Sequence, residues 1–237
     1  MKPIIIYGNS TMAKQVYLDA AQHDSELKIA AFCASDEFLR GEQLFCDVPL
    51  VKESEVLQEY SPDKYDMLSC VDAPSRLRNR IMVYEKLKSM GYNLINYVSP
   101  AANISPLAKL SENNVFFAHC HVYFDASFGH SNTVRSTAIV GHEVVVGSGT
   151  NISEGAVIGG NAQIGDSCWI GMNGTINNRV VLANDTLVAS GAVVMQSTRQ
   201  GFSYIGNPAK AFFSHEETGI MLDFGRWGKR TGGENEL

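Results

Sequence analysis

The amino-acid sequence predicts an N-terminal α/β domain with a small parallel, Rossmann-like sheet, followed by a parallel β-helix of hexapeptide repeats. Two observations carry this prediction. Over residues 1–97, short apolar runs alternate with stretches in which apolar residues recur at helical spacing, which is the rhythm of βαβ units. From Ile104 onward, an apolar residue instead recurs at every sixth position. A helix has no period of six, so this half of the chain is expected to consist of stacked short strands and turns.

The hexapeptide pattern is continuous. A step of six residues from Ile104 to Val194 gives sixteen positions, all apolar, and a glycine follows at six of them. We expect the apolar side chains to point inward and the glycines to take positive φ where the chain bends. Coils of three hexads should stack with strands about 4.8 Å apart, without an inserted loop before Arg199. The sixteen positions are Ile104, Leu110, Phe116, Val122, Phe128, Val134, Val140, Val146, Ile152, Ile158, Ile164, Ile170, Ile176, Leu182, Val188 and Val194.

The N-terminal region predicts a parallel sheet flanked by helices. We expect strands at residues 4–6, 29–32 and 66–71, a helix over 13–20, and a longer helix over about 74–90. Ligands of such sheets bind beyond the carboxyl ends of the strands. The loop after the first strand lacks the three glycines of the dinucleotide-binding fingerprint. It is therefore either a simple strand-to-helix turn or a phosphate site formed by free N–H groups at the helix start.

Composition argues against several classes of function. The net charge of −6 and the lack of a dense Lys/Arg cluster argue against nucleic-acid binding. Five cysteines, an odd number without a CxxC pair, indicate reduced thiols rather than a disulfide or zinc framework. No apolar run is long enough to span a bilayer, and the first strand-like segment is too short for a signal peptide. We expect a cytoplasmic protein with neither a nucleic-acid nor a membrane partner.

A family resemblance rests on the α/β region, the repeat and two short motifs. The motifs are Gly141-His142-Glu143 in a hexad turn and the closing segment from Gly206 to Lys210. With these features the chain resembles the sialic-acid O-acetyltransferase and nucleotide-sugar amine N-acetyltransferase family of bacterial surface-glycan synthesis. The resemblance implies a left-handed β-helix, a homotrimer and an active site between neighbouring subunits. It also implies acetyl-CoA along the coils and a nucleotide-linked sugar on the α/β domain.

The expected division of the chain follows from the two patterns. We expect the α/β domain to cover residues 1–99, the β-helix to cover residues 100–212, and a partly disordered C-terminal tail to cover residues 213–237. The resemblance implies that the α/β domain binds the nucleotide sugar and that the β-helix is the acyltransferase domain.

The resemblance assigns the chemistry to His142. It would act as the general base, and Glu143 would orient it; the alternative is a solvated turn residue. Gly160 lies one coil of eighteen residues further on, where an exposed N–H could hold the thioester oxygen. Asn151 stands where many relatives carry a second histidine. The residues expected at the acyl group and coenzyme A are Gly160, Asn151, Asn178, Ala189 and Lys210.

The nucleotide-linked sugar is expected at the carboxyl ends of the N-terminal strands. Free N–H groups in the first loop could hold a phosphate, and Asp36 could accept a hydrogen bond from a ribose or base or be an ordinary loop residue. The first loop of the family is typically glycine-rich with a histidine, which this chain does not have. The expected contacts are Gly8, Asn9, Ser10, Asp36 and Asp72.

These expectations give one leading function and three alternatives. The leading function is an acetyl-CoA-dependent N-acetyltransferase acting on the amino group of a nucleotide-linked sugar. O-acetylation of sialic acid or another sugar hydroxyl is the enzymatic alternative, and a non-catalytic scaffold that binds nucleotide sugars is the non-enzymatic one. Hexapeptide proteins that bind zinc through three histidines suggest a lyase, but His119, His121 and His130 do not share one obvious edge. We therefore expect no metal.

Overall fold

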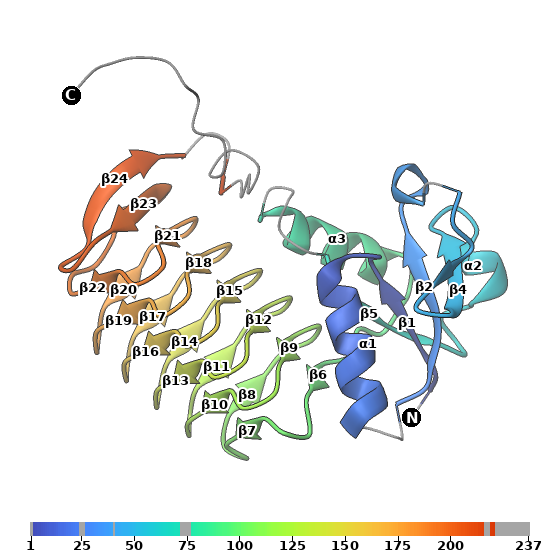
Figure 1. Ribbon diagram of the computed structural model, residues 1–237, viewed down its shortest axis with the longest axis horizontal. Helices are drawn as coiled ribbons and strands as arrows, with labels where there is room; N and C mark the ends of the chain where they lie inside the picture. Colours follow the sequence, from blue (N-terminus) through green and yellow to red (C-terminus); the bar gives the residue numbers. More distant parts are fainter. Residues whose placement is uncertain (1, 24–26, 40, 72–76, 216–218, 221–237) are drawn as a thin grey trace.

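The protein consists of an α/β domain at one end of a long three-sided prism (Figure 1). This computed structural model describes residues 2–23, 27–39, 41–71, 77–215 and 219–220. The predicted contact Asp72 lies outside these residues. No helix among them is long and apolar enough to cross a membrane.

The N-terminal sheet is mostly parallel, as predicted. Its strand order is β3-β4-β2-β1-β5, and only β3 runs antiparallel to its neighbour. Helix α1 packs on one face of the sheet, whereas α2 and α3 pack on the other. The bounds are β1 Ile4–Tyr7, α1 Thr11–His23, β2 Ile29–Ala34, the short 3₁₀ helix η1 Asp36–Phe38, β3 Leu44–Phe45, β4 Val48–Lys52, α2 Val56–Glu59, β5 Asp66–Ser69 and α3 Asn79–Ser89.

The expected strands at 4–6, 29–32 and 66–71 correspond to β1, β2 and β5, and the two expected helices correspond to α1 and α3. The β3–β4 hairpin was not predicted. Its turn uses Cys46 and Asp47 at φ 53° and 61°, and Cys46 is an unusual residue for that left-handed conformation.

Residues 97–214 wind through three sheets, which are parallel apart from the last strand, β24. Each strand pairs with the strand eighteen residues later, as Val122 pairs with Val140, and this register is unbroken up to β22.

Sheet 1 faces the N-terminal domain and holds β6 Tyr97–Val98, β9 Val115–Phe116, β12 Thr133–Val134, β15 Asn151–Ile152, β18 Trp169–Ile170, β21 Leu187–Val188, β23 Phe202–Ile205 and the antiparallel β24 Lys210–Ser214. Sheet 2 holds β7 Asn103–Ile104, β10 His121–Val122, β13 Ile139–Val140, β16 Val157–Ile158, β19 Thr175–Ile176 and β22 Val193–Val194. Sheet 3 holds β8 Lys109–Leu110, β11 Ser127–Phe128, β14 Val145–Val146, β17 Gln163–Ile164 and β20 Val181–Leu182.

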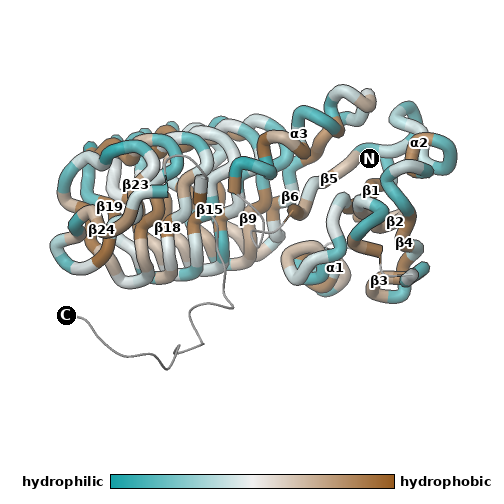
Figure 2. Tube along the Cα trace, turned by 90° about the horizontal axis from the view of Figure 1, so that it is seen from above, coloured by the Kyte–Doolittle hydropathy of each residue, from teal (hydrophilic) through white to brown (hydrophobic). Residues whose placement is uncertain are grey.

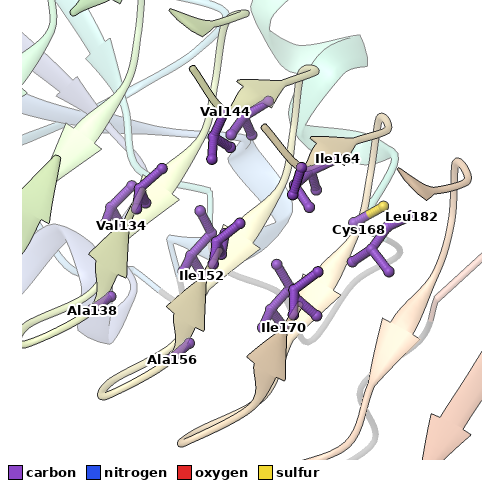
Figure 3. Packing of buried hydrophobic residues seen from close by; sticks show 14 of the residues in the cluster. Val134, Ala138, Val144, Ile152, Ala156, Ile164, Cys168, Ile170 and Leu182 are labelled. Carbon is purple, nitrogen blue, oxygen red and sulfur yellow. The ribbon is translucent and has the colours of Figure 1, made fainter. Parts of the chain in front are cut away.

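The interior of the prism confirms the hexapeptide prediction. Of the sixteen repeat positions, fourteen are buried, and Ile104 and Leu110 in the first coil are partly buried against the same core. Successive coils stack Val134, Ile152 and Ile170 above one another (Figure 3). Because each layer contacts mainly its neighbours, the stability of the prism is close to a nearest-neighbour sum.

The predicted role of the glycines was wrong. The glycines that follow the apolar positions do not have positive φ; instead, a side chain there would collide with the next coil. A Cβ on Gly141 would lie 2.8 Å from the backbone nitrogen of Gly160, and a Cβ on Gly171 would lie 2.6 Å from that of Ser190. Positive φ falls two residues later, in fourteen consecutive hexads, at Asn113, His119, Asp125, Ser131, Thr137, Glu143, Gly149, Gly155, Asn161, Ser167, Asn173, Arg179, Asp185 and Gly191.

The N-terminal domain and the prism share a core. Val115 and Phe117 of the first coils belong to the same buried cluster as Met12 of α1, and Arg80 of α3 donates a hydrogen bond of 3.1 Å to Thr133. In Figure 2 the domain lies against the end of the prism that begins with β6 and β9. Removing the N-terminal domain would therefore expose apolar surface on the prism, and such surface promotes aggregation. Point variants in the N-terminal domain avoid this problem.

Part of the predicted C-terminal tail is ordered. Phe213 and Ser214 complete β24 but are exposed, whereas two later residues are packed. His215 is buried, with Nε2 2.6 Å from the carbonyl oxygen of Asp185. Ile220 is buried with Leu77, and Arg78 makes two hydrogen bonds to the Asp185 carboxylate, at 2.8 and 2.7 Å. Described tail residues thus contact both the prism and the segment before α3. The expected disorder of the last residues lies outside the described part of the chain.

A stacked pair joins α3 to the prism. The rings of Tyr84 and His130 lie 3.8 Å apart, nearly parallel at 11°. Burial lowers the pKa of His130, against the opposing influence of Asp166, Glu85 and Glu112. The folded-state pKa of His130 is therefore below the unfolded value of about 6.5, so folding favours the neutral ring. The contribution of His130 to the free energy of unfolding is fully present above that pH. It is lost as the pH falls through the folded-state pKa.

We therefore expect the melting temperature to fall from pH 7 to pH 5 more steeply in the wild type than in His130→Phe. The variant keeps a ring that can stack on Tyr84 but has no proton to gain. Calorimetry at both pH values measures the difference, and parallel decreases would show that His130 does not couple pH to stability.

Candidate active site

One longitudinal edge of the prism carries most of the residues predicted for chemistry. It lies where each coil turns from sheet 2 to sheet 3, and we call it the His142 edge. Phe124, His142, Gly160 and Asn178 occupy equivalent positions in four successive coils, each eighteen residues after the one before. The predicted superposition of Gly160 on His142 is therefore present.

His142 and Glu143 form a pair on this edge. Nδ1 of His142 lies 2.9 Å from Oε2 of Glu143, and the two side chains are 45% and 53% exposed. Asn161, one coil further on, donates a hydrogen bond of 3.3 Å to the same carboxylate oxygen. Because an ionised carboxylate only accepts hydrogen bonds, Nδ1 of the neutral imidazole carries the proton in this pair. Nε2 is then the acceptor, which is the arrangement of a general base.

The imidazole of His142 lies between two neighbouring coils. On one side the ring of Phe124 stacks on it, with centroids 5.4 Å apart and planes 14° apart. On the other side lies Gly160, where an added Cβ would come within 2.5 Å of Nε2 and 2.7 Å of Cε1. The ring therefore fits only because residue 160 has no side chain.

The exposed N–H expected at Gly160 needs correction. Gly160 is buried, because the imidazole of His142 covers it. Its N–H donates no hydrogen bond to any residue in the described ranges. Gly160 therefore keeps a backbone donor without an acceptor among the described residues, but one that is buried rather than exposed.

The residues predicted to contact coenzyme A lie on two different edges. Asn178 is exposed on the His142 edge. Ala189 is half-buried where the chain turns from sheet 1 to sheet 2, and Lys210 is exposed at the start of β24, at the same end of the prism. Within one chain, these residues do not converge on His142.

Asn151 is not an acyl contact of its own chain. It lies in β15 of sheet 1, is fully buried, and donates a hydrogen bond of 3.0 Å from Nδ2 to the hydroxyl of Ser153. The spacing of nine residues places Asn151 on a different side of the prism from His142, because a coil of eighteen residues returns to the same edge only after a full turn.

A pocket of about 800 Å³ opens at the carboxyl ends of β1, β2 and β5. Gly8, Asn9 and Ser10, three of the expected nucleotide-sugar contacts, line it. Gly8 has φ 124°, and a Cβ there would lie 2.8 Å from the carbonyl oxygen of Cys70, so the turn requires glycine. The Ser10 hydroxyl caps α1 by accepting a hydrogen bond of 3.4 Å from the N–H of Ala13.

Among the described residues that line this pocket, the acidic one is Glu37, and Asp36 is not among them. The Asp36 carboxylate accepts a hydrogen bond of 2.8 Å from the Ser54 hydroxyl, an interaction that lowers the pKa of Asp36. Glu37, the next residue in η1, lines the pocket together with Phe38. The sequence run Asp36-Glu37 does not reveal which of the two residues lines the pocket, so Glu37 was not predicted.

A polar network lies beside the pocket. Tyr7 and Lys86, both lining residues, donate hydrogen bonds to Glu53, and Ser35 donates one of 3.2 Å to the same carboxylate. Burial would raise the pKa of Glu53, but the hydrogen bonds from Lys86 and Tyr7 outweigh it and lower that pKa. Lys86, the one cationic residue among the described residues lining the pocket, is therefore already paired with Glu53.

The three histidines of the zinc alternative are dispersed. His119 has φ 63° after β9, His121 stacks on Tyr123, and His130 stacks on Tyr84. Within the described residues, no group of three or more His, Cys, Asp or Glu side chains could hold a metal ion.

Comparison with known proteins finds matches among solved structures. No protein-family model and no curated protein sequence matches the chain. The acetyltransferase domain of PglB from Neisseria gonorrhoeae is 23% identical, with a TM-score of 0.78 over 90% of this chain and 100% of that domain. The same domain in complex with acetyl coenzyme A has a TM-score of 0.79, over 89% of this chain and 99% of that one, also at 23% identity.

Two further structures are similar. PerB from Caulobacter crescentus, in complex with CoA and GDP-perosamine, is 21% identical with a TM-score of 0.71, over 90% of this chain and 98% of that one. WeeI from Acinetobacter baumannii is 18% identical with a TM-score of 0.65, over 90% of this chain and 100% of that one. The chain therefore shares its fold, an α/β domain followed by a parallel β-helix, with these three proteins over nearly its whole length.

Proposed function

We propose that this protein is an acetyl-CoA-dependent N-acetyltransferase that acts on the amino group of a nucleotide-linked sugar. The observation that carries the proposal is the His142–Glu143 pair, with Nδ1 on the carboxylate and Nε2 available as a base. Structures of the same fold support it, because the PglB domain binds acetyl coenzyme A and PerB binds CoA together with GDP-perosamine. The left hand of the β-helix and the Rossmann-like character of the N-terminal domain belong to the same proposal.

The proposed reaction is a direct acyl transfer. The amine nitrogen of the sugar attacks the thioester carbonyl, and Nε2 of His142 takes a proton from that nitrogen. The N–H of Gly160 would stabilise the oxyanion of the tetrahedral intermediate. Collapse of this intermediate breaks the carbon–sulfur bond, and the departing thiolate takes the proton from His142. Glu143 stabilises the imidazolium that exists between the two proton transfers.

A panel of acceptors distinguishes the candidate functions. The wild-type protein is incubated with acetyl-CoA and nucleotide-linked amino sugars, the matching hydroxyl sugars, or sialic acid, and free thiol is measured. We expect thiol release that depends on an amino sugar nucleotide. Release only with a hydroxyl acceptor would favour the O-acetyltransferase, because an alcohol needs stronger activation than an amine. Tight nucleotide-sugar binding without thiol release would favour the scaffold.

We further propose that the active site is shared between subunits of a trimer. In one chain, Ala189 and Lys210 lie away from the His142 edge, so a ligand could contact both sets only if a second chain brings its own edge alongside. Exposed apolar residues on the outer faces of sheets 2 and 3, such as Ile139 and Val145, are consistent with packing between prisms.

Subunit mixing tests this arrangement. Light scattering should give a trimer. The variant His142→Asn removes the base, and the variant Ser190→Trp places a large side chain beside Ala189. Each variant should be inactive alone. In trimers mixed at random from equal amounts of the two variants, about a quarter of the sites would combine His142 from one chain with Ser190 from its neighbour. Activity should therefore return to about a quarter of the wild-type value. Mixed trimers no more active than the separate variants would contradict a shared site.

The nucleotide is assigned to the pocket of the N-terminal domain. Glu37 would accept hydrogen bonds from the ribose or base, whereas Asp36 is occupied by Ser54. Replacing Glu37 with Ala should raise the KM for the nucleotide sugar about tenfold, the effect of losing a hydrogen bond to a charged group. The KM for acetyl-CoA should not change. The matched Asp36→Ala change should leave both values near wild type, and a larger effect at Asp36 than at Glu37 would refute the assignment.

A further inference from the structure

We infer that Phe124 is a positioning residue, whose ring holds the imidazole of His142 in the plane that directs Nδ1 to Glu143 and leaves Nε2 facing the substrates. Phe124 is a large apolar residue that is 45% exposed. It does not belong to any of the buried clusters found among the described residues. Its ring contact is the stack on His142, at 5.4 Å and 14°.

The hydrogen bond to Glu143 alone does not fix the imidazole. It holds a single ring atom, and the last torsion of a histidine side chain has broad energy wells. Gly160 limits one face of the ring by its close approach, but it presents no side chain. An aromatic ring on the opposite face restricts this torsion, because rotation of the imidazole would break an offset stack.

The same contact also affects the charged form of the ring. When His142 takes the substrate proton it becomes a cation, and the face of Phe124 favours a cation electrostatically. Glu143 is the charged group in contact with this ring. Asp125 and Arg179 occupy the positions equivalent to Glu143, one coil before it and two coils after it. Since Phe124 acts on the ring rather than on the cosubstrate, its loss should lower kcat more than it changes the KM for acetyl-CoA.

The test compares two changes at Phe124 with one at its neighbour. Phe124→Leu keeps an apolar side chain but removes the ring, and Phe124→Tyr keeps the ring. Tyr123→Leu is the matched control, because Tyr123 is 42% exposed and stacks on His121 instead. We expect Phe124→Leu to lower kcat about three- to tenfold, with the KM for acetyl-CoA within about twofold. Phe124→Tyr and Tyr123→Leu should stay near wild type.

A second readout does not require the reaction. The Cε1–H signal of His142 is identified in proton NMR spectra by its disappearance in His142→Asn. Its ring-current shift should be lost in Phe124→Leu and kept in Phe124→Tyr.

The two readouts separate this inference from the proposed function on which its catalytic consequence rests. If Phe124→Leu keeps the wild-type kcat, or if the His142 signal does not change, the inference is overturned while the acetyltransferase proposal stands. If the wild type acetylates none of the acceptors, the proposed function fails. The NMR shifts then decide whether Phe124 positions the ring.

Discussion

Replacing His142 with Asn is expected to lower kcat by about 10²–10⁴-fold, which corresponds to roughly 3–5 kcal/mol of barrier. The side chain of His142 is 45% exposed and does not belong to the aliphatic core, which Val140 and Val146 supply in this hexad. Folding and the binding of acetyl-CoA should therefore be nearly unchanged, and the KM for acetyl-CoA should change little. Steady-state kinetics and a melting curve of the same preparation measure both parts of the prediction.

Glu143→Gln provides the graded comparison. It removes the charge that stabilises the imidazolium but keeps a hydrogen-bond acceptor, so we expect a loss on the order of tenfold. A His142→Asn enzyme with more than about a third of the wild-type kcat would make His142 an ordinary turn residue.

Replacing Gly160 with Ala should reduce kcat about 10²-fold or more, even though it adds only one methyl group. That group would lie 2.5 Å from Nε2 of His142, so the imidazole has to move away from Glu143. Displacement of a catalytic group by about 1 Å is sufficient for a loss of this size. This steric effect acts in addition to any role of the Gly160 N–H as an oxyanion donor.

A double-variant comparison separates the two roles of Gly160. In a His142→Ala background there is no ring to displace, so Gly160→Ala should lower the residual rate little if its effect is steric. A further large loss in that background would mean that the N–H itself stabilises the oxyanion. Loss of folding in Gly160→Ala, seen in its melting curve, would contradict the steric account, because the collision involves a half-exposed side chain rather than the core.

The β-helix was predictable because its long-range contacts follow a single sequence period. Once an apolar residue recurs every six positions and three hexads make a coil, the pairing of Val122 with Val140 and the approach of Gly160 to His142 both follow. The same arithmetic places Asn151 on another side of the prism, half a coil from His142, so its expected contact with the acyl group is not formed with the His142 of its own chain and stays a prediction. The glycine φ values were missed because steric contact between coils leaves no local signal.

The N-terminal pocket was less predictable, because its contacts join segments without a shared period. The strand-to-helix turn at Gly8 could be recognised, but the choice between Asp36 and Glu37 depends on Ser54, a residue from another loop. Likewise, the network of Tyr7, Ser35 and Lys86 around Glu53 joins separate elements, and no spacing in the sequence relates them. The positions of these side chains are set by packing between segments that are distant in the sequence.

The most direct test of the central claim is a single-turnover experiment with acetyl-labelled coenzyme A and the best amino sugar nucleotide from the panel. Wild-type protein and His142→Asn are quenched at successive times, and the label is measured on coenzyme A, on the protein and on the sugar. The account predicts that in the wild type the label passes in one step to the amino group, without labelled protein, and that His142→Asn binds both substrates but transfers the label at least about 10²-fold more slowly. Label accumulating on the protein, or transfer by His142→Asn at the wild-type rate, would contradict it.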